Sequence, residues 1–277
     1  MIRGTTRLIA HIGYPTHTFK APLIYNPYFE HAAIDTVVVP MGCESGPYPA
    51  FLRAVFSLTN IVGALITMPH KVSTVALLDE MSPAVRIAGS CNAVRRAPDG
   101  RLQGDLFDGE GFVRGMRRKG LELQGARALV VGAGGVGSAI AASLAAAGAA
   151  ELALFDARAE SASGLAQRLR EHYPRLRVTT GSKDAAGYNV VVNATPLGMK
   201  EGDPLPVDVA RLERDTFVGE VVMREEMTPF LRAAQARGCR FQVGADMLYE
   251  QIPVYLEFFG LPSTTPEMLR SLAKISY

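Results

Sequence analysis

Short apolar runs alternate with helical patterns along the first hundred residues. Three of these runs are rich in branched side chains and bounded by turn residues, which predicts buried strands at 7–13, 36–42 and 61–67. The segments 22–34 and 48–58 between them have helical patterns, and a further helix is predicted at 71–79. Strands that alternate with helices are typical of a mostly parallel α/β sheet, so we expect one here.

A second α/β unit begins near Arg127. An apolar strand there leads through a Gly-rich turn into an Ala-rich helix, and further strand and helix patterns follow. The polar stretch 96–104 closes the first region, and the boundary between the two units is expected within 108–124. The tail has two helical patterns, broken near 260–262. The sequence therefore predicts an α/β protein of two domains.

The composition is that of a globular protein, because 48% of the 277 residues are hydrophobic and 20% are charged. A net charge of +2 gives no electrostatic footprint for a nucleic acid. The longest apolar stretch, 139–153, is too short and too weakly hydrophobic to span a bilayer, and the first residues lack a signal-peptide core. The three cysteines have neither disulfide nor metal-ligand spacing. We expect a cytoplasmic protein without a bound metal, a nucleic-acid partner or a membrane partner.

The six residues from Gly132 to Gly137 satisfy the pattern GxGxxG after a predicted strand and at the start of a predicted helix. Dinucleotide binding requires this context. Gly132 permits a tight turn, Gly134 lets the backbone approach a pyrophosphate, and Gly137 lets helix and strand pack closely. Gly135 and Val136 complete the turn at the helix N-terminus, whose free N–H groups attract phosphate. The alternative is a Gly-rich turn without a ligand.

An acidic residue follows the next predicted strand. Asp156 ends this strand at about the spacing, roughly 20 residues, at which dinucleotide-binding folds hold the adenine ribose. Its carboxylate would repel a 2′-phosphate, which favours NAD over NADP. Arg158 is the counter-evidence, because a guanidinium at this turn could pair with a 2′-phosphate. Asp156 could instead serve as a helix cap or turn residue. We expect NAD as the cofactor, with NADP possible.

Seven short motifs follow one another along nearly the whole chain. They are Gly13–Pro15 with Pro22, Ile66–Lys71, Gly89–Asn92, Asp108–Phe112, the GAGGVG turn, Asn193–Met199 and Gly244–Gln251. In order and spacing they resemble the shikimate/quinate dehydrogenase family. The resemblance implies a substrate-binding domain at 1–108, a Rossmann-type domain at 109–246, and a C-terminal segment, 247–277, that packs back on the first domain. It also implies hydride transfer between a nicotinamide and a ring hydroxyl or ketone, in a cleft between the domains.

The resemblance also implies a catalytic pair. Lys71 matches the family's catalytic lysine, which would donate or accept the hydroxyl proton. Asp108 matches the aspartate that orients the substrate hydroxyl and the lysine head group. Either residue alone has an ordinary alternative: Lys71 as a surface lysine, and Asp108 as the aspartate of an Asp-Gly turn. Their occurrence together in two family motifs favours catalysis.

Further site residues follow from the same resemblance. Thr67, Asn92 and Gln251 match positions that hydrogen-bond the ring hydroxyls. Met199 and Leu248 match positions beside the nicotinamide, and core packing is the alternative for both. The other positions expected along the cofactor crevice are Asn193, Thr195, Pro196 and Gly244.

The chain departs from the family where the substrate carboxylate is held. With Pro22 aligned to the family's proline, Phe19 and Ala21 occupy the positions of two carboxylate-binding serines. Three further polar contacts are replaced by Leu106, Phe107 and Met223. Hydrogen bonds to a charged group contribute roughly 1.5–3 kcal/mol each, so a carboxylate would bind weakly in such a pocket. Side chains that could hold it from another angle are His17, Thr18, Lys20 and Arg224.

Three functions stay open at this point. The first is an NAD-dependent dehydrogenase of shikimate, quinate or a related cyclic polyol. The second is the same chemistry on a less polar cyclic alcohol or ketone without a carboxylate. The third is a dinucleotide-binding homologue that has lost turnover, against which the retained Lys71 and Asp108 argue. By resemblance the protein is a monomer or a homodimer.

Overall fold

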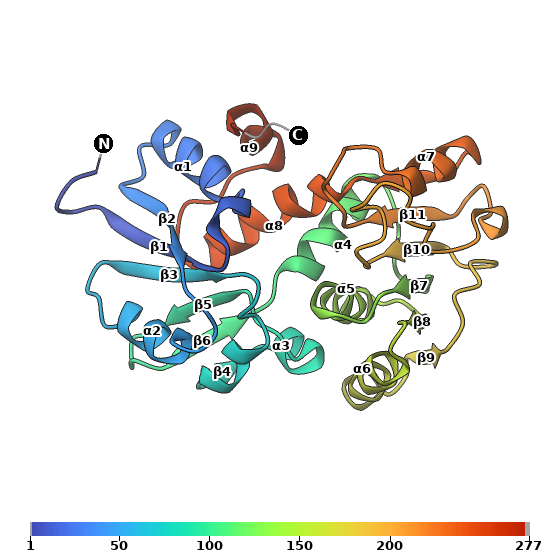
Figure 1. The fold of residues 1–277 in the computed structure, drawn as a ribbon, viewed down its shortest axis with the longest axis horizontal. Coiled ribbons are helices and arrows are strands. Elements are labelled where there is room, and N and C mark those ends of the chain that lie inside the picture. Colours follow the sequence, from blue (N-terminus) through green and yellow to red (C-terminus); the bar gives the residue numbers. More distant parts are fainter. Residues whose placement is uncertain (1, 275–277) are drawn as a thin grey trace. The chain divides into compact units, whose positions relative to one another are not determined.

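The computed structural model describes residues 2–274 and divides the chain into two compact units (Figure 1). Of the described residues, the first unit contains 2–107 together with 252–274. The second unit contains residues 108–251. Of the C-terminal segment that the sequence analysis expects on the first domain, residues 275–277 lie outside the described residues.

The unit boundaries differ by a few residues from the expected domain boundaries. Asp108 belongs to the second unit because it begins helix α4 (Asp108–Arg118). The second crossing falls at Gln251, inside helix α8 (Gly244–Phe258), so the first turns of α8 also belong to the second unit. The chain therefore passes from one unit to the other at the start of α4 and again within α8. Neither of these segments has the composition of a linker.

The sheet of the first unit has the strand order β2-β1-β3-β5-β6-β4. The strands are β1 (Arg7–Gly13), β2 (Thr36–Gly42), β3 (Ile61–Ile66), β4 (Glu80–Met81), β5 (Ala93–Arg96) and β6 (Leu102–Asp105). As the sequence predicts, β1, β2 and β3 are parallel neighbours. Ligands of parallel α/β sheets bind beyond the carboxyl ends of the strands, so the edge after β1 and β3 is the place to look for a site.

Helices of the first unit begin near the predicted residues at 22, 48 and 266, whereas those at 16–18 and 83–88 are not predicted. The helices are η1 (Thr16–Thr18), α1 (Pro22–His31), α2 (Tyr48–Val55), η2 (Ser73–Leu77), α3 (Pro83–Ala88) and α9 (Pro266–Leu272). The helix predicted at 71–79 is the exception, since only the short 3-10 turn η2 forms. The Ser73 and Thr74 hydroxyls donate to the His70 carbonyl at 3.1 and 2.8 Å, and such bonds compete with α-helix formation.

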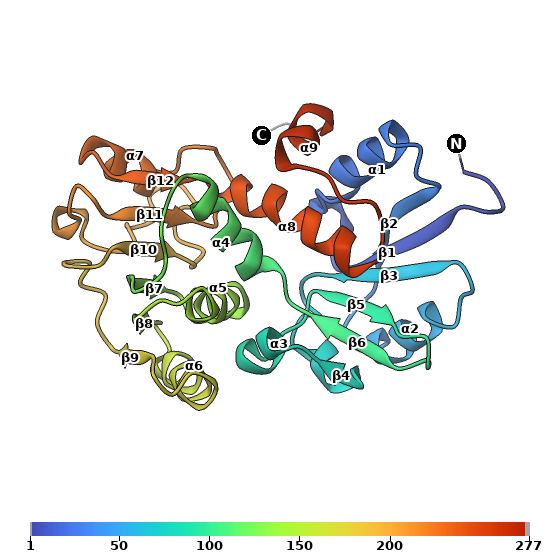
Figure 2. The ribbon, with the colours of Figure 1, turned by 180° about the vertical axis from the view of Figure 1, so that it is seen from behind.

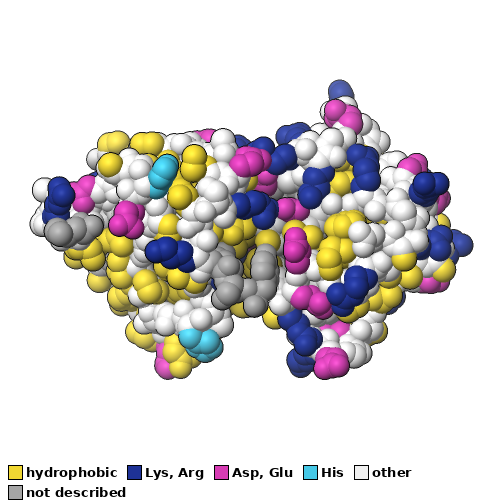
Figure 3. Space-filling view, turned by 90° about the horizontal axis from the view of Figure 1, so that it is seen from above, with side chains coloured by type: hydrophobic (Ala, Val, Ile, Leu, Met, Phe, Trp, Pro, Cys, Tyr) yellow, Lys and Arg dark blue, Asp and Glu magenta, His cyan; other side chains and the backbone are white. Residues whose placement is uncertain are grey.

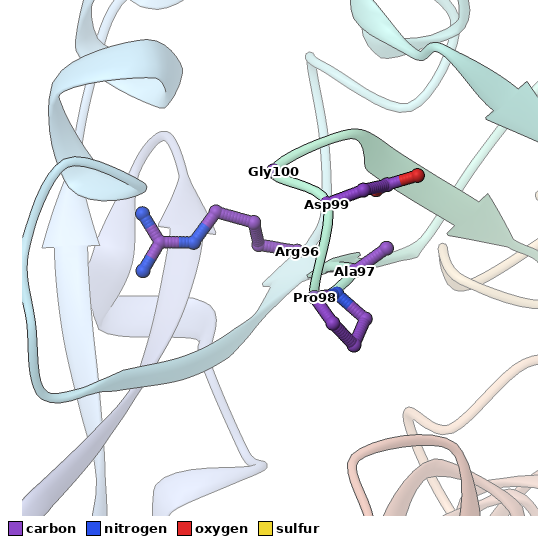
Figure 4. Close-up of a pocket in the computed structure, with 5 residues that line it drawn as sticks. All are labelled: Arg96, Ala97, Pro98, Asp99 and Gly100. Carbon is purple, nitrogen blue, oxygen red and sulfur yellow. The ribbon is translucent and has the colours of Figure 1, made fainter.

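The polar stretch expected at 96–104 is part of an antiparallel hairpin, β5–β6. Its turn contains Pro98, Asp99 and Gly100, and the Gly100 N–H donates to the Ala97 carbonyl at 2.9 Å. Figure 4 shows a pocket at this turn, lined by Arg96, Ala97, Pro98, Asp99 and Gly100. None of the residues that the sequence analysis assigns to a site lies in it.

The second unit has a six-stranded parallel sheet in the order β12-β11-β10-β7-β8-β9. Its strands are β7 (Arg127–Val131), β8 (Glu151–Phe155), β9 (Arg177–Thr180), β10 (Val190–Asn193), β11 (Phe217–Glu220) and β12 (Arg240–Gln242). Its other helices are α5 (Gly135–Ala146), α6 (Ala159–His172), η3 (Val209–Arg211) and α7 (Pro229–Ala236). Figure 2 shows α5 and α6 side by side next to β7, β8 and β9. The strand order reverses at β7, between β8 and β10, which is where doubly wound sheets bind dinucleotides.

The distribution of surface charge, the helix lengths and the cysteines describe further general properties of the molecule. Figure 3 shows basic and acidic side chains interspersed over the second unit on the face in view. No helix among the described residues is both long and apolar enough to cross a membrane. Cys43, Cys91 and Cys239 are buried free thiols. Within residues 2–274, no group of three or more His, Cys, Asp or Glu side chains could hold a metal ion.

Candidate active site

The carboxyl edge of the first sheet brings Thr67 and Phe19 to the end of β1. Thr67 follows β3, and its backbone N–H donates to the Ile12 carbonyl at 2.9 Å. A Cβ atom on Gly13 would lie 2.4 Å from Thr67 Cγ2 and 3.0 Å from Phe19 Cζ. Glycine leaves the room for both side chains to pack over the strand end. Two residues that the sequence assigns to the substrate therefore lie together here.

Lys71 is anchored through its backbone and through the residue before it. The Lys71 carbonyl accepts a hydrogen bond from the Cys91 N–H at 2.8 Å. The preceding side chain, His70, is fully buried and stacks on the Tyr48 ring with 3.8 Å between the ring centroids. Its Nε2 lies 2.7 Å from the Cys43 carbonyl oxygen. These contacts fix the point from which the lysine side chain extends.

Asn92 is held next to Cys91 and carries an unsatisfied donor. Its backbone carbonyl accepts from the Ile66 N–H at 2.8 Å, and its side-chain Oδ1 accepts from the Phe107 N–H at 3.0 Å. Among the described residues, the buried Nδ2 has no hydrogen-bond partner. A buried amide without a partner is costly, and such groups are rare in native structures. An acceptor atom of a ligand, such as a ring hydroxyl, would satisfy this donor.

Two other predicted site residues, Asp108 and Gln251, belong to the second unit. Asp108 is buried and directly follows Phe107, whose N–H Asn92 holds. Gln251 is also buried, and its Oε1 has no partner in the part of the chain that the structure describes. Helices α4 and α8 pack closely, since a Cβ on Gly111 would lie 2.7 Å from Gln251 Cβ. Lys71 belongs to the first unit and Asp108 to the second, so contact between their side chains stays a prediction.

Apolar side chains occupy the positions at which the family has polar substrate contacts. Phe19 is half-buried at the end of η1, and Ala21 is half-buried just before α1. Leu106 and Phe107 are core residues, and the Phe107 ring packs edge-on against Tyr255 with 4.9 Å between centroids. Leu106 and Phe107 therefore have packing roles in the core of the first unit.

His11 lies beside these residues, and the sequence analysis did not select it. It lies on β1 and its ring stacks on Phe19, with 4.0 Å between the centroids and 28° between the planes. Burial, with a smaller contribution from the charge of Lys71, lowers the pKa of His11 to about 4. A single histidine inside the apolar run RLIAHIG was the available signal.

The Gly-rich turn of the second unit has the geometry that a pyrophosphate requires. Gly132 has φ +106°, and a Cβ there would lie 2.5 Å from the Ala194 carbonyl oxygen. A Cβ on Gly137 would lie 1.9 Å from the Gly132 carbonyl oxygen, so this glycine keeps α5 close to the turn. By contrast, no atom lies within 4 Å of a Cβ on Gly134. The open space at Gly134, directly before α5, fits a dinucleotide phosphate.

Asp156 directly follows β8 and lies beside this turn. Its Oδ2 accepts from the Ala133 N–H at 2.7 Å, and its Oδ1 accepts from the Arg158 N–H at 2.9 Å. Arg158 is exposed and directly precedes α6, with no side-chain hydrogen bond to the start of the helix. The carboxylate is therefore fixed at the end of β8 with remaining lone pairs for a ribose hydroxyl.

A buried network links the loops after β10 and β11. The Glu220 carboxylate accepts from Asn193 Nδ2 at 2.9 and 3.2 Å, from the Thr228 hydroxyl at 3.0 Å, and from the next two backbone N–H groups at 2.8 and 3.0 Å. Asn193 Oδ1 accepts from the Thr195 hydroxyl at 2.6 Å. Burial raises the pKa of Glu220, and these donors oppose that effect. The sequence analysis missed Glu220, although an acid inside the apolar run FVGEVV marks it.

The remaining predicted cofactor residues lie on the same loops or on α8. Met199 is 59% exposed, and its carbonyl accepts from the Arg224 guanidinium at 3.4 Å. Pro196 is also exposed, and Leu248 is half-buried on α8. A Cβ on Gly244 would lie 2.3 Å from the Val222 carbonyl oxygen, so the start of α8 packs on the loop after β11. The exposure of Met199 excludes core packing as its role.

Comparison with known proteins assigns both halves of the chain. The family model of the shikimate dehydrogenase substrate binding domain matches residues 11–94, and that of shikimate / quinate 5-dehydrogenase matches residues 116–198. The shikimate dehydrogenase (NADP(+)) of Rubrobacter xylanophilus is 35% identical over 277 residues, which cover 98% of this chain and 97% of the relative.

Solved structures agree with these matches. Shikimate 5-dehydrogenase from Listeria monocytogenes, in complex with shikimate and NAD, is similar with a TM-score of 0.91 at 25% identity, over 98% of this chain and 97% of that one. The 5-ketofructose reductase of Gluconobacter sp. strain CHM43 has a TM-score of 0.88 at 25% identity, over 96% and 98%. The predicted family and fold class are confirmed. The chain belongs to the shikimate dehydrogenase family, and it is an oxidoreductase of the shikimate/quinate dehydrogenase type.

Proposed function

We propose that this protein interconverts a ring hydroxyl and a ring ketone of shikimate, quinate or a related cyclic polyol, with a nicotinamide dinucleotide as hydride carrier. The observation that carries the proposal is the buried Asn92 Nδ2, which has no partner among the described residues. This donor lies one residue from Cys91, whose N–H holds the Lys71 backbone. A donor that a ligand atom could satisfy is thus fixed to the same short segment that positions the proton-transfer group.

Lys71 and Asp108 supply the acid–base chemistry in this proposal. As the alcohol is oxidised, the hydroxyl proton passes to Lys71 Nζ, and in the reduction Lys71 returns it. Asp108 accepts a hydrogen bond from the hydroxyl and orients it. When bound, the nicotinamide takes or gives the hydride. Asn92 Nδ2 and Gln251 hold the neighbouring hydroxyls, which orients the ring.

We propose NAD as the preferred nucleotide. Asp156 supports this choice, because its fixed carboxylate is suited to a ribose 2′-hydroxyl and repels a 2′-phosphate. The names of curated relatives weigh toward NADP, since the Rubrobacter xylanophilus protein is a shikimate dehydrogenase (NADP(+)). The Listeria monocytogenes enzyme, in contrast, was solved with NAD. The local charge at Asp156 decides our proposal.

A second candidate is the same reaction on a cyclic substrate without a carboxylate. Phe19 and Ala21 support it, because neither side chain can donate a hydrogen bond to an anion. Burial of a carboxylate without compensating hydrogen bonds is strongly unfavourable. The similarity to a 5-ketofructose reductase supports it as well, since the name of that protein gives a keto sugar as its substrate.

An initial-rate screen of the purified protein tests these proposals together. Formation of NADH and NADPH is followed with shikimate, quinate and carboxylate-free cyclic diols. We expect turnover with NAD exceeding that with NADP. If the neutral diols are oxidised and both acids are not, the second candidate replaces the first. Absence of turnover with every alcohol would refute the dehydrogenase proposal.

The role of Lys71 is tested in the same assay. Lys71→Ala removes the amine, and Lys71→Arg keeps a positive charge that cannot accept a proton. We expect both variants to lose on the order of 10²–10⁴-fold in kcat. Lys274→Ala, on the exposed C-terminal segment, is the matched control and keeps full activity. Activity that survives in Lys71→Ala would exclude the assigned mechanism and favour another proton-transfer group.

A further inference from the structure

The His11 ring has a nitrogen without a hydrogen-bond partner and stacks on Phe19, which occupies the position of one of the family's carboxylate-binding serines. The His11 side chain is buried, and its Nδ1 has no hydrogen-bond partner among the described residues. Buried side-chain nitrogens are nearly always paired with protein, water or ligand. His11 Nδ1 and Asn92 Nδ2 are two of six buried side-chain atoms without a partner in the described part of this unit.

The surroundings of His11 connect it to the substrate positions. Residues 11 and 13 of β1 point to the same face of the sheet, because side chains alternate along a strand. Phe19 stacks on the His11 ring and reaches Gly13 with its Cζ atom, and the Thr67 methyl group also lies at Gly13. The imidazole is thus one element of a wall that also contains Phe19 and Thr67.

The His11 side chain itself carries no charge that would hold an anion. His11 is uncharged near pH 7, because burial and the charge of Lys71 lower its pKa to about 4. A neutral imidazole has one donor and one acceptor nitrogen, which suits a hydroxyl group. The stacked Phe19 ring adds no polar atom. One neutral nitrogen cannot replace the two hydroxyl donors that would compensate a buried carboxylate.

We infer that His11 is a specificity-determining residue whose Nδ1 hydrogen-bonds an uncharged hydroxyl of the substrate, at the place where family members hold a carboxylate. The inference rests on the proposed function in the form of its second candidate, a cyclic substrate without a carboxylate, and it specifies an uncharged hydroxyl at this position. His11 takes no part in hydride or proton transfer in this assignment.

Ligand binding tests this inference independently of turnover. Three ligands differ at one substituent: shikimate, its analogue with a hydroxymethyl group in place of the carboxylate, and the analogue with a methyl group there. Their dissociation constants are measured by calorimetry on the full-length protein without nucleotide, so that no turnover occurs. We expect the wild type to bind the hydroxymethyl analogue about tenfold to a hundredfold more tightly than either other ligand.

Four variants separate a polar contact from a structural role. His11→Phe keeps an aromatic ring against Phe19, and His11→Val is an apolar alternative suited to a strand. Both are expected to reduce the preference for hydroxymethyl over methyl to less than about threefold, whereas His11→Asn keeps a polar atom near Nδ1 and retains part of it. His31→Phe, at the exposed end of α1, is the control for a histidine-to-phenylalanine change and keeps the full preference.

Two results would overturn the inference. One is tighter binding of shikimate than of the hydroxymethyl analogue by the wild type. The other is an equal loss of affinity for the hydroxymethyl and methyl analogues in folded His11 variants, which would make His11 a packing residue. Failure of the proposed function has a different signature, since the hydroxymethyl analogue would bind with the stated preference and yet give no NADH or NADPH in the rate assay.

Discussion

The same substitution, glycine to alanine, should have different effects at two positions of the Gly-rich turn. Gly137→Ala places a Cβ 1.9 Å from the Gly132 carbonyl oxygen, a backbone atom that cannot rotate away. Gly134→Ala places a Cβ where no atom lies within 4 Å, on a residue with φ −74° that any amino acid adopts. We expect Gly137→Ala to lower the free energy of unfolding, and Gly134→Ala to leave it nearly unchanged while it weakens nucleotide binding.

The magnitudes follow from these contacts. Overpacking by one methyl group costs about 1–3 kcal/mol, and each kcal/mol lowers Tm by roughly 2–4 °C in a domain of 150–250 residues. Gly137→Ala should therefore melt roughly 2–12 °C below the wild type. For Gly134→Ala the free energy of unfolding should change by less than about 0.5 kcal/mol. Its methyl group occupies the approach to the pyrophosphate, so the Kd for NADH should rise by about tenfold or more, which is about 1.4 kcal/mol.

Thermal unfolding without nucleotide gives the Tm of both variants, and NADH fluorescence titration gives the Kd. Gly46→Ala is a control for an open glycine far from the turn in sequence, since a Cβ there has no atom within 4 Å. It should match the wild type in both measurements. Wild-type NADH affinity in Gly134→Ala would refute the assignment of this turn to the pyrophosphate. A wild-type Tm in Gly137→Ala would refute the steric argument.

Three further predictions concern charged groups. Asp156→Asn should raise the ratio of kcat/KM for NADP over NAD by about tenfold to a hundredfold, because it removes a negative charge near the 2′ position; an unchanged ratio in initial-rate assays would contradict this. The pKa of His11 is lowered from 6.5 to about 4, so the unfolded chain binds more protons than the folded chain between these pH values. The free energy of unfolding should therefore rise by up to about 3 kcal/mol as the pH increases from about 4 to 6.5. Urea denaturation at several pH values should show that His11→Phe lacks this rise. Glu220→Gln should destabilise the second unit by about 1–3 kcal/mol, because the new amide group would face the donors that hold the loop after β10. It should also raise KM for the nucleotide more than it lowers kcat. Urea midpoints and KM values equal to those of the wild type would contradict this prediction.

The sequence predicts elements well where one pattern determines them. The runs at β1, β2 and β3 are short and apolar between turn residues, and the structure has these strands with the predicted parallel pairing. The hairpin β5–β6 was not predicted, because its strands have four residues each and Arg95, Arg96 and Gln103 interrupt the apolar pattern. The predicted helix at 71–79 also failed to form, since its first hydroxyl groups bond to the backbone at His70. Local pairing of this kind overrides periodicity.

The sequence predicted only those residues of the candidate site that belong to recognisable motifs. The motifs locate Lys71, Asn92 and the Gly-rich turn, and the structure adds which polar atoms are left without partners. His11 and Glu220 are single polar residues within apolar runs, so neither periodicity nor spacing selects them. Their significance comes from neighbours distant in sequence: Phe19 and Lys71 for His11, and Asn193 and Thr228 for Glu220.

The way each residue is held explains how specificity can change while the chemistry persists. The positions of Lys71 and Asn92 are set by main-chain hydrogen bonds, from Cys91 to Lys71 and from Ile66 to Asn92, and these bonds do not involve the side chains of Phe19 and His11. Phe19 and His11 contact one another through their rings alone. A change from serine to phenylalanine in that wall therefore alters the group presented to the substrate without moving the proton-transfer residue. Under the proposed function, the proton-transfer residue Lys71 and the ring pair of Phe19 and His11 are therefore held by different kinds of contact, so the family's reaction can be retained while one substituent on its substrate changes.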